Sequence, residues 1–473
     1  MTQQLSKQIK VNYGLGQLGW AAKDTCFQFF LFFYYTQMLG LSPSLAGLAA
    51  LLALVADAVS DPVIGHISDH WHSKKWGRRH PFMLISIVPF CASLIAIFNP
   101  PTELSQMQLF SWYLALAIII RSCLTLYTVP HMALGAELSD DYSERTSIAI
   151  YRNLLGYLSG LSIQVVAWFL LIPTAVAAGS MIDGYRNIGY LAAIVAAIGM
   201  TVAVFGTRGE IPRLMHLSER DNKRPWYYAF INLASLFRIG PARILLLASL
   251  IVATTTGVSS TMLLHINTYF YGFSSEQMGI FMLCIVLALA PASWLASNGT
   301  RWLGKPRAVI AMLVMVALLG PIPVMAHLYG LAPANGSTAL LIFVCCFIVV
   351  HQSFFIAHLN IVSAMVPDVV DEIEVVSGRR QAGILNSAVM LTQKMTFGLG
   401  AFIAGLVIEY SGFSGVNSVS HVTVEMLSKL AWFYGPGLSC IVLIAVAVYR
   451  RYRVNQERYD EIRLKLNHMR NSI

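Results

Sequence analysis

Two acidic residues, Asp57 and Asp61, interrupt an apolar stretch of the sequence, and Pro62 follows them directly. Their spacing of four places both carboxylates on the same face of a helix. A carboxylate in the middle of a membrane costs about 2.5–3.5 kcal/mol on insertion scales, so such acids face a protein interior and usually mark a path for ions. The pair therefore predicts an ion-handling site. The alternative is that the acids only form ion pairs with basic residues of other segments: Lys394, Arg121 or Arg152.

The composition of the chain indicates an integral membrane protein. Of its 473 residues, 56% are hydrophobic and 12% are charged, whereas soluble domains carry about 25% charged residues. Apolar stretches of about twenty residues, the length of a membrane-spanning helix, recur from end to end. The first ten residues are polar, so we expect no cleavable signal peptide.

Charge and cysteine content argue against several other classes of protein. The net charge of +9 is explained by basic residues in cytoplasmic loops, so we expect a lipid bilayer as partner and no nucleic acid. The seven cysteines lie in apolar segments without metal-ligand spacing, which predicts neither a disulfide framework nor a zinc site. The sequence contains no nucleophile triad or phosphate-binding loop. It therefore predicts a protein that is not an enzyme and has no cofactor beyond a coupling ion.

Twelve membrane spans account for the hydrophobic pattern, six on each side of a polar, basic loop. The predicted spans are 12–38, 44–70, 80–100, 106–137, 146–178, 184–207, 244–272, 275–300, 308–328, 337–366, 381–410 and 427–449. An amphipathic interfacial helix is predicted in the loop, opening at Pro225. The predicted parts are an N-terminal half (1–207), the loop (208–243), a C-terminal half (244–449) and a basic tail (450–473).

The distribution of basic residues predicts the orientation of the chain. All but six of the 32 Lys and Arg residues lie in the termini and the even-numbered loops. Cytoplasmic loops carry this excess, so both termini and the central loop are predicted to be cytoplasmic. The expected location is the cell membrane, which is the inner membrane in a Gram-negative bacterium.

Short repeats relate the two halves of the sequence. Trp76–Pro81 after the second span is similar to Trp302–Arg307 after the eighth, and Ser143–Arg145 is similar to Ser377–Arg379. Twelve spans in two similar halves resemble the major facilitator superfamily, whose substrate site lies between the halves near mid-membrane. We therefore expect an all-α integral membrane protein with twelve transmembrane helices in two pseudo-symmetric six-helix halves.

A more specific resemblance rests on two segments, Asp57–Pro62 (DAVSDP) and Trp76–Phe82 (WGRRHPF). They resemble the glycoside–pentoside–hexuronide:cation symporters, the melibiose-permease family, over nearly the whole chain. Further positions fit the same pattern: Lys23-Asp24, Val129-Pro130, Arg152-Asn153 and Lys394. The resemblance implies a secondary transporter that moves a sugar or glycoside together with a cation by alternating access.

The resemblance assigns the acidic pair to the coupling cation. It implies that Asp57 and Asp61 are ligands, with Thr125 of the fourth span as a further oxygen ligand. Ser60 retains a side-chain oxygen where the family often has Asn. A small hard cation such as Na⁺ or Li⁺ prefers several oxygen ligands. Two neighbouring carboxylates also repel each other, so H⁺ can replace the metal ion.

The resemblance also implies a substrate site that includes the first and fifth spans. Asp24, beside Lys23 and several phenylalanines, is implied to accept hydrogen bonds from sugar hydroxyls, and Arg152 to help hold the sugar. Lys394 of the eleventh span is predicted to link the two sites by pairing with whichever acid is vacant. The alternative for Asp24 is that it only balances the charge of Lys23.

Three positions depart from the melibiose-type pattern. Thr128 stands in place of a second sugar-binding Asp, Met132 in place of a Trp, and Leu54 in place of an Arg. These changes weaken the expectation of a galactoside and leave another glycoside, a uronide or a more apolar substrate. Animal relatives of the family move lysolipids, so a lysolipid-like or other amphipathic substrate is one alternative. A proton-driven exporter on the same fold is another, and a receptor or enzyme on this scaffold is a third.

Charged residues near the cytoplasmic face form two predicted groups. Gly65-xxx-Asp69 followed by Gly77, Arg78 and Arg79 resembles the signature loop of the superfamily. There Asp69 is expected to cap or pair across the face while the arginines contact anionic headgroups. A second group is predicted to close an inner gate by ion pairs between the halves: Asp140, Asp141, Glu144, Arg145, Asp368, Asp371, Arg379 and Arg380. The alternative is ordinary solvated loop charge.

Overall fold

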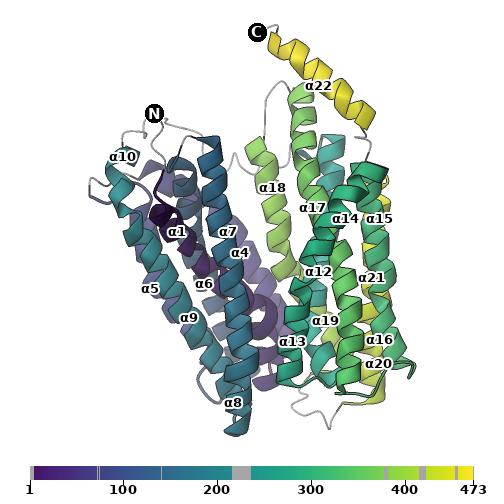
Figure 1. Cartoon of the computed structure of the whole chain (residues 1–473). Coiled ribbons are helices and arrows are strands. Elements are labelled where there is room, and N and C mark those ends of the chain that lie inside the picture. Colours follow the sequence, from purple (N-terminus) through teal and green to yellow (C-terminus); the bar gives the residue numbers. More distant parts are fainter. Residues whose placement is uncertain are drawn as a thin grey trace. The chain divides into compact units, whose positions relative to one another are not determined.

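The computed structural model describes residues 5–71, 73, 75–139, 141–215, 236–377, 382–414, 422–452 and 456–471. Within these ranges the chain is almost entirely helical, and extended pairing is limited to a β-bridge between Ser73 and Gly77. The chain divides into two compact units, Met1–Tyr227 and Tyr228–Ile473, whose helices are labelled in Figure 1. The division falls inside the range 208–243, which the sequence analysis describes as a polar loop.

Eleven helical runs in the described part of the chain are long and apolar enough to cross a membrane. They are Pro43–Gly65, His80–Phe98, Gln106–Glu137, Ser143–Ala177, Met181–Leu214, Gly240–Phe270, Ser275–Leu303, Lys305–Leu328, Thr338–Val375, Leu391–Tyr410 and Val424–Tyr449. The predicted first span corresponds to a further run of short helical segments over Lys7–Met38. With that run, the described residues are consistent with the twelve predicted spans.

The first run is the most irregular because it changes helix type several times. A turn at Gly16 separates α1 (Lys7–Leu15) from α2 (Gln17–Thr25), and α3 (Leu31–Phe33) lies between π-helical turns at Cys26–Phe30 and Tyr34–Met38. π-Helical turns inside helices are frequent at functional sites. Polar side chains of this run, including Lys23 and Asp24, are buried or half-buried within the first unit.

The remaining helices of the first unit are longer. They are α4 (Pro43–His70), α5 (His80–Phe98), α6 (Gln106–Glu137), α7 (Tyr142–Val166), α8 (Ile172–Ala177), α9 (Met181–Gly206) and α10 (Ile211–Met215). α6 begins at a capping box in which Ser105 Oγ accepts a hydrogen bond from Gln108 N, and Gln108 Oε1 accepts from Ser105 N at 3.0 Å. Pro62 and Pro130 lie inside α4 and α6, where each removes one backbone donor.

Packing in the first unit is centred on α6, which contacts both α4 and α5 along its length. α9 packs against α5, while α1 and α2 pack against α7 and α9. The close approach of α1 to α6 depends on Gly135, because a Cβ there would meet the ring of Tyr13. This packing sets the rotation of α4 and α6, and therefore decides which of their polar side chains meet.

The second unit consists of α12 (Gly240–His265), α13 (Ser275–Val286), α14 (Leu289–Leu303), α15 (Lys305–Leu319), α16 (Pro321–Leu328), α17 (Thr338–Ser377), α18 (Ala382–Met395), α19 (Ala401–Tyr410), α20 (Val424–Trp432), α21 (Leu438–Tyr449) and α22 (Gln456–Asn471). One apolar cluster joins α12, α15, α17 and α21 through Leu245, Val309, Ile361 and Val442. α22, which lies outside the predicted spans, adds Ile462 to the same cluster.

Large apolar side chains on the outer faces of the helices suit a lipid environment. Val88 of α5 is 75% exposed, and Leu158 and Ile194 are also exposed on α7 and α9. Soluble proteins rarely expose contiguous apolar surface of this kind. Of the predicted central loop, the structure describes Arg208–Met215 and the part from 236 onward; the predicted helix opening at Pro225 lies outside the described residues.

Candidate cation and substrate site

Asp57 and Asp61 of α4 face Thr125 of α6. Thr125 Oγ1 lies 3.0 Å from Asp57 Oδ1 and 2.8 Å from Asp61 Oδ1. A hydroxyl has one proton, so it donates to only one carboxylate at a time. The second short contact requires either a proton on the other acid, which then donates to the hydroxyl, or a cation shared by the oxygens. The structure thus brings together three of the four predicted cation ligands.

Ser60, the fourth predicted ligand, is placed differently. Its hydroxyl donates to the backbone carbonyl of Asp57 at 3.1 Å and to neither carboxylate. Serine side chains inside helices commonly bond to carbonyls one turn earlier. Its proton is thus used within α4, while its oxygen keeps lone pairs, and a role of Ser60 as a cation ligand stays a prediction.

Arg121 adds a positive charge to the acidic pair. It lies one turn before Thr125 on α6, and its Nη1 is 3.5 Å from Asp57 Oδ2. Only 4% of the Arg121 side chain is exposed. Asp57 therefore forms the ion pair with Arg121 that was the alternative to an ion-handling site. It does so in addition to its contact with Thr125. The sequence signal for Arg121 was its spacing of four from Thr125, which puts both on one helix face.

Asp24 and Lys23 of α2 form a second charged group in the same unit. Lys23 Nζ is 3.7 Å from Asp24 Oδ1 and lies over the ring of Phe27 at 5.4 Å. Arg121 lies over the same ring at 5.7 Å. Asp24 Oδ1 is buried and has no hydrogen-bond partner among the described residues. Lys23 thus balances the charge of Asp24 over a long ion-pair distance. The buried oxygen Asp24 Oδ1 is left without a hydrogen bond.

The other predicted substrate residues are more dispersed. Arg152 of α7 is half-buried, and its Nε and Nη2 each lie 3.4 Å from Oδ1 of the adjacent Asn153. On α6, Thr128 is half-buried and Met132 is 41% exposed at the surface of the first unit. Lys394 is half-buried on α18 in the second unit. Within the described part of the first unit, Arg152, Thr128 and Met132 make no hydrogen bond or ion pair with Asp24.

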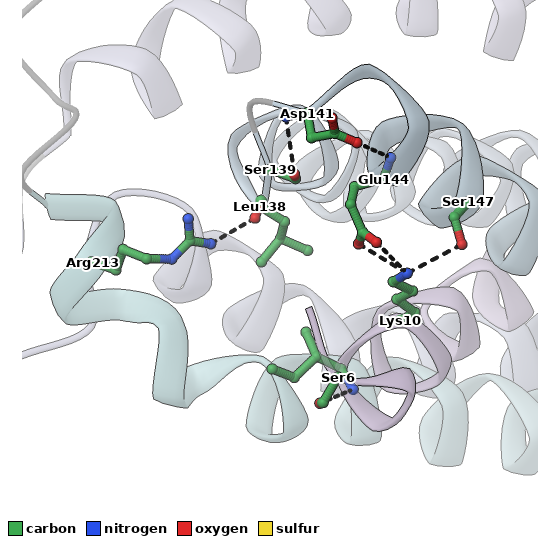
Figure 2. A network of polar contacts seen from close by, with 9 residues as sticks. Ser6, Lys10, Leu138, Ser139, Asp141, Glu144, Ser147 and Arg213 are labelled. Carbon is green, nitrogen blue, oxygen red and sulfur yellow. Dashed lines mark hydrogen bonds and ion pairs between the residues drawn. The ribbon is translucent and has the colours of Figure 1, made fainter. Parts of the chain in front are cut away.

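Most charges at the predicted cytoplasmic end of the first unit bind within that unit (Figure 2). Asp141 caps α7 by accepting a hydrogen bond from Glu144 N at 2.8 Å. Glu144 itself pairs with Lys10 at 2.9 Å, and Arg145 Nε donates to Ser139 O at 2.6 Å. Asp141, Glu144 and the Nε of Arg145 thus each make a contact within the first unit; Asp140 lies outside the described residues.

The signature loop is held by an acid that the sequence analysis missed. Glu137 Oε1, at the end of α6, lies 2.8 Å from Arg78 Nη2 and 2.9 Å from Arg79 Nη2. Arg79 Nη1 also donates to Ser68 Oγ at 3.2 Å. Both guanidiniums are directed to Glu137 and Arg79 is buried, while contact of these arginines with lipid headgroups stays a prediction.

Backbone geometry explains the glycine of the same loop. Gly77 has a φ of +66°, in the left-handed region, and forms the β-bridge with Ser73. Trp76 is covered by the Arg208 guanidinium at 4.4 Å. Backbone pairing and side-chain contacts therefore define the conformation of the loop. The side chain of Asp69 lies outside the described residues.

Two acidic residues at the corresponding end of the second unit also form ion pairs within that unit. Asp368 of α17 pairs with Lys305 at 2.6 Å, and Glu372 lies 4.0 Å from Arg458 of α22. Asp371 is half-buried, while Arg379 and Arg380 lie outside the described residues. A gate between the halves stays a prediction.

The helices and the buried charged cluster define a multi-pass membrane transporter. The chain matches the family described as MFS/sugar transport protein over residues 12–456 and belongs to it. Within the major facilitator superfamily it is a member of the glycoside–pentoside–hexuronide:cation symporters, as its motifs predicted. The family consists of transporters, so the protein is a transporter and not an enzyme.

Three proteins illustrate what the chain is similar to. An isoprimeverose transporter of Lactiplantibacillus pentosus is 23% identical over 88% of this chain and 83% of its own. A sodium-dependent lysophosphatidylcholine symporter of Gallus gallus is 23% identical over 99% of this chain and 90% of its own. The solved xylose transporter XylE of E. coli has a TM-score of 0.61 at 13% identity, covering 95% of this chain and 98% of XylE. The last likeness concerns the fold alone.

Proposed function

We propose that the protein is a symporter that couples the transport of a sugar or glycoside to Na⁺ or H⁺ by alternating access. The observation that carries the proposal is the position of Thr125 Oγ1 between Asp57 Oδ1 and Asp61 Oδ1, at 3.0 and 2.8 Å. Three oxygens from two packed helices converge there. Oxygen ligands of this kind suit a small hard cation, and the same pair of acids can share a proton.

The local charge supports a single monovalent ion. Asp57 and Asp61 carry two negative charges when ionised, and Arg121 contributes one positive charge at 3.5 Å from Asp57. Lys23 and Asp24 cancel each other. Around Thr125 the described acids thus outnumber the described bases, and a monovalent cation has the sign that suits them.

The substrate half of the proposal rests on Asp24 and its surroundings. Its buried, unsatisfied Oδ1 is an acceptor for a hydroxyl donor, and the ring of Phe27 lies 5.4 Å from Nζ of Lys23, the ion-pair partner of Asp24. A polyol offers both hydroxyl donors and C–H surface, which match a carboxylate next to an aromatic ring. The relative that transports isoprimeverose supports a sugar of this kind. We further propose that both termini are cytoplasmic, in a bacterial inner membrane, from the bias of basic residues.

The test uses purified full-length protein in proteoliposomes, with isoprimeverose, melibiose and D-xylose as probes. An inward Na⁺ or H⁺ gradient is expected to drive accumulation of at least one sugar. Asp57→Asn and Asp61→Asn should abolish gradient-driven accumulation while the proteins remain inserted and folded. Gradient-driven uptake that is unchanged in both variants would exclude the acidic pair as the cation site. Accumulation only in inverted vesicles would favour an exporter.

A lysolipid is the second candidate substrate. The observations behind it are the similarity to the lysophosphatidylcholine symporter and the exposed apolar Met132 on α6. An exposed apolar side chain about two turns along α6 from Thr125 suits an acyl chain better than a sugar ring. Na⁺-dependent uptake of lysophosphatidylcholine by the same proteoliposomes, without a response to any sugar, would establish this candidate in place of the first.

A further inference from the structure

Arg121 has hydrogen-bonding capacity that the described protein does not use. Its Nε and Nη2 are both buried without a hydrogen-bond partner among the described residues. Nη1 makes one contact, to Asp57 Oδ2, and at 3.5 Å it is at the limit of hydrogen bonding. By comparison, Arg79 makes contacts of 2.9 and 3.2 Å to Glu137 and Ser68. Buried guanidinium donors are costly to leave unsatisfied, so those of Arg121 require a partner from outside the described residues.

An unsatisfied hydrogen-bond acceptor lies in the second charged group, that of Asp24 and Lys23. Asp24 Oδ1 is buried without a hydrogen-bond partner, and the charge of Asp24 interacts with those of Lys23 and Arg121. The ring of Phe27 is contacted by both Lys23 and Arg121, at 5.4 and 5.7 Å. Arg121 of α6 and Lys23 of α2 thus meet at one aromatic ring, and open donors on Arg121 face a pair whose acid, Asp24, has an open acceptor. A molecule with neighbouring hydroxyl groups supplies an oxygen that accepts from Arg121 and a hydroxyl that donates to Asp24.

We propose that Arg121 is a ligand-binding residue shared by the two sites, contacting Asp57 of the cation site and, through Nε and Nη2, the hydroxyl oxygens of a sugar. The proposal deepens the proposed function and rests on it. Arg121 is then the physical link by which the coupling ion controls substrate affinity. The guanidinium carbon of Arg121 lies 5.7 Å from the centre of the Phe27 ring, within the range of a cation–π contact.

The direction of coupling follows from electrostatics. Without a cation, the net negative charge of Asp57 and Asp61 attracts the guanidinium and competes with the substrate. A bound cation neutralises the acids and weakens the hold on Nη1, which releases the guanidinium to donate to the sugar. By thermodynamic reciprocity the sugar raises cation affinity by the same factor. The long 3.5 Å contact between Arg121 and Asp57 is consistent with a guanidinium that changes partner.

Two variants of Arg121 separate this role from a purely structural one. Arg121→Lys keeps the positive charge beside Asp57 but replaces a planar donor set by a point charge. Arg121→Met removes charge and donors while keeping most of the volume. The exposed Arg450, which makes no described side-chain contact, provides the matched control Arg450→Met. Sugar affinity is measured by thermal stabilisation of the purified protein, with and without saturating Na⁺ and at two pH values.

In the wild type, the cation is expected to tighten sugar binding by roughly tenfold, within the usual range of coupling between sites. Arg121→Lys should still be stabilised by Na⁺ or H⁺, yet the ratio of sugar affinities with and without the cation should fall to about one. Arg121→Met should lose measurable sugar binding, and Arg450→Met should behave as the wild type.

The possible failures are distinguishable. A folded Arg121→Lys protein with the wild-type affinity ratio would overturn the role of Arg121 and leave the proposed function intact. If Arg121→Met does not fold, Arg121→Lys alone decides the matter. If no sugar stabilises the wild type under any cation condition, the proposed function fails and the inference fails with it.

Discussion

Thr125 Oγ1 lies 2.8 Å from Asp61 Oδ1, although the two residues are 64 positions apart in the sequence. The contact joins α4 to α6 in the interior of the first unit. Because the same hydroxyl is 3.0 Å from Asp57, it holds the two carboxylates around one point. This arrangement turns an acidic pair on one helix into an oxygen cluster with ligands from two helices.

Removal of the Thr125 hydroxyl should weaken binding of the coupling ion. Thr125→Val keeps the shape of the side chain and deletes one oxygen ligand, while Thr125→Ser keeps the oxygen. We expect the ion concentration for half-maximal uptake to rise by roughly tenfold in Thr125→Val, equivalent to about 1.4 kcal/mol. Thr125→Ser should stay within about threefold of the wild type. Equal ion dependence in the two variants would remove Thr125 from the cation site.

Loss of the Glu137 charge should destabilise the loop after the second span. Glu137→Gln leaves Arg78 and Arg79 without their shared carboxylate partner. One of these arginines is buried while Glu137 is 21% exposed, so loss of the charged hydrogen bonds should cost about 2 kcal/mol of folding stability and lower the melting temperature in detergent. The matched control is Glu103→Gln, at an exposed position in the loop before α6, which should leave the melting temperature unchanged. Equal melting temperatures of the Glu137→Gln and Glu103→Gln proteins would show that the ion pairs of Glu137 contribute little to stability.

A side chain at position 77 should be poorly tolerated. Gly77 has a φ of +66°, where a Cβ costs roughly 1–2 kcal/mol. An added Cβ would also come 3.2 Å from Ile211 Cγ2. Gly77→Ala should therefore lower the melting temperature, whereas Gly209→Ala, where a Cβ meets no atom within 4 Å, should not. The comparison is made by thermal unfolding of the two purified variants, and a Gly77→Ala protein as stable as the wild type would contradict the strain argument.

The pattern of apolar residues was sufficient to predict the architecture. Eleven of the predicted spans correspond to described helical runs, because each must be apolar for about twenty residues to cross a membrane. The first span departs most, since Gly16 and two π-helical turns divide the run over Lys7–Met38. Hydropathy reports the length of a span but carries little information about local changes in helix type.

The sequence by itself determined that Asp57 and Asp61 share a helix face, because a spacing of four is a property of any α-helix. It also pointed to Thr125 through the family resemblance. Only the tertiary structure decided that Arg121 reaches Asp57, that Ser60 bonds to its own helix, and that Glu137 binds Arg78 and Arg79. These contacts depend on the rotation of α4 and α6 about their axes. Packing of many apolar side chains sets that rotation, and no local sequence pattern specifies it.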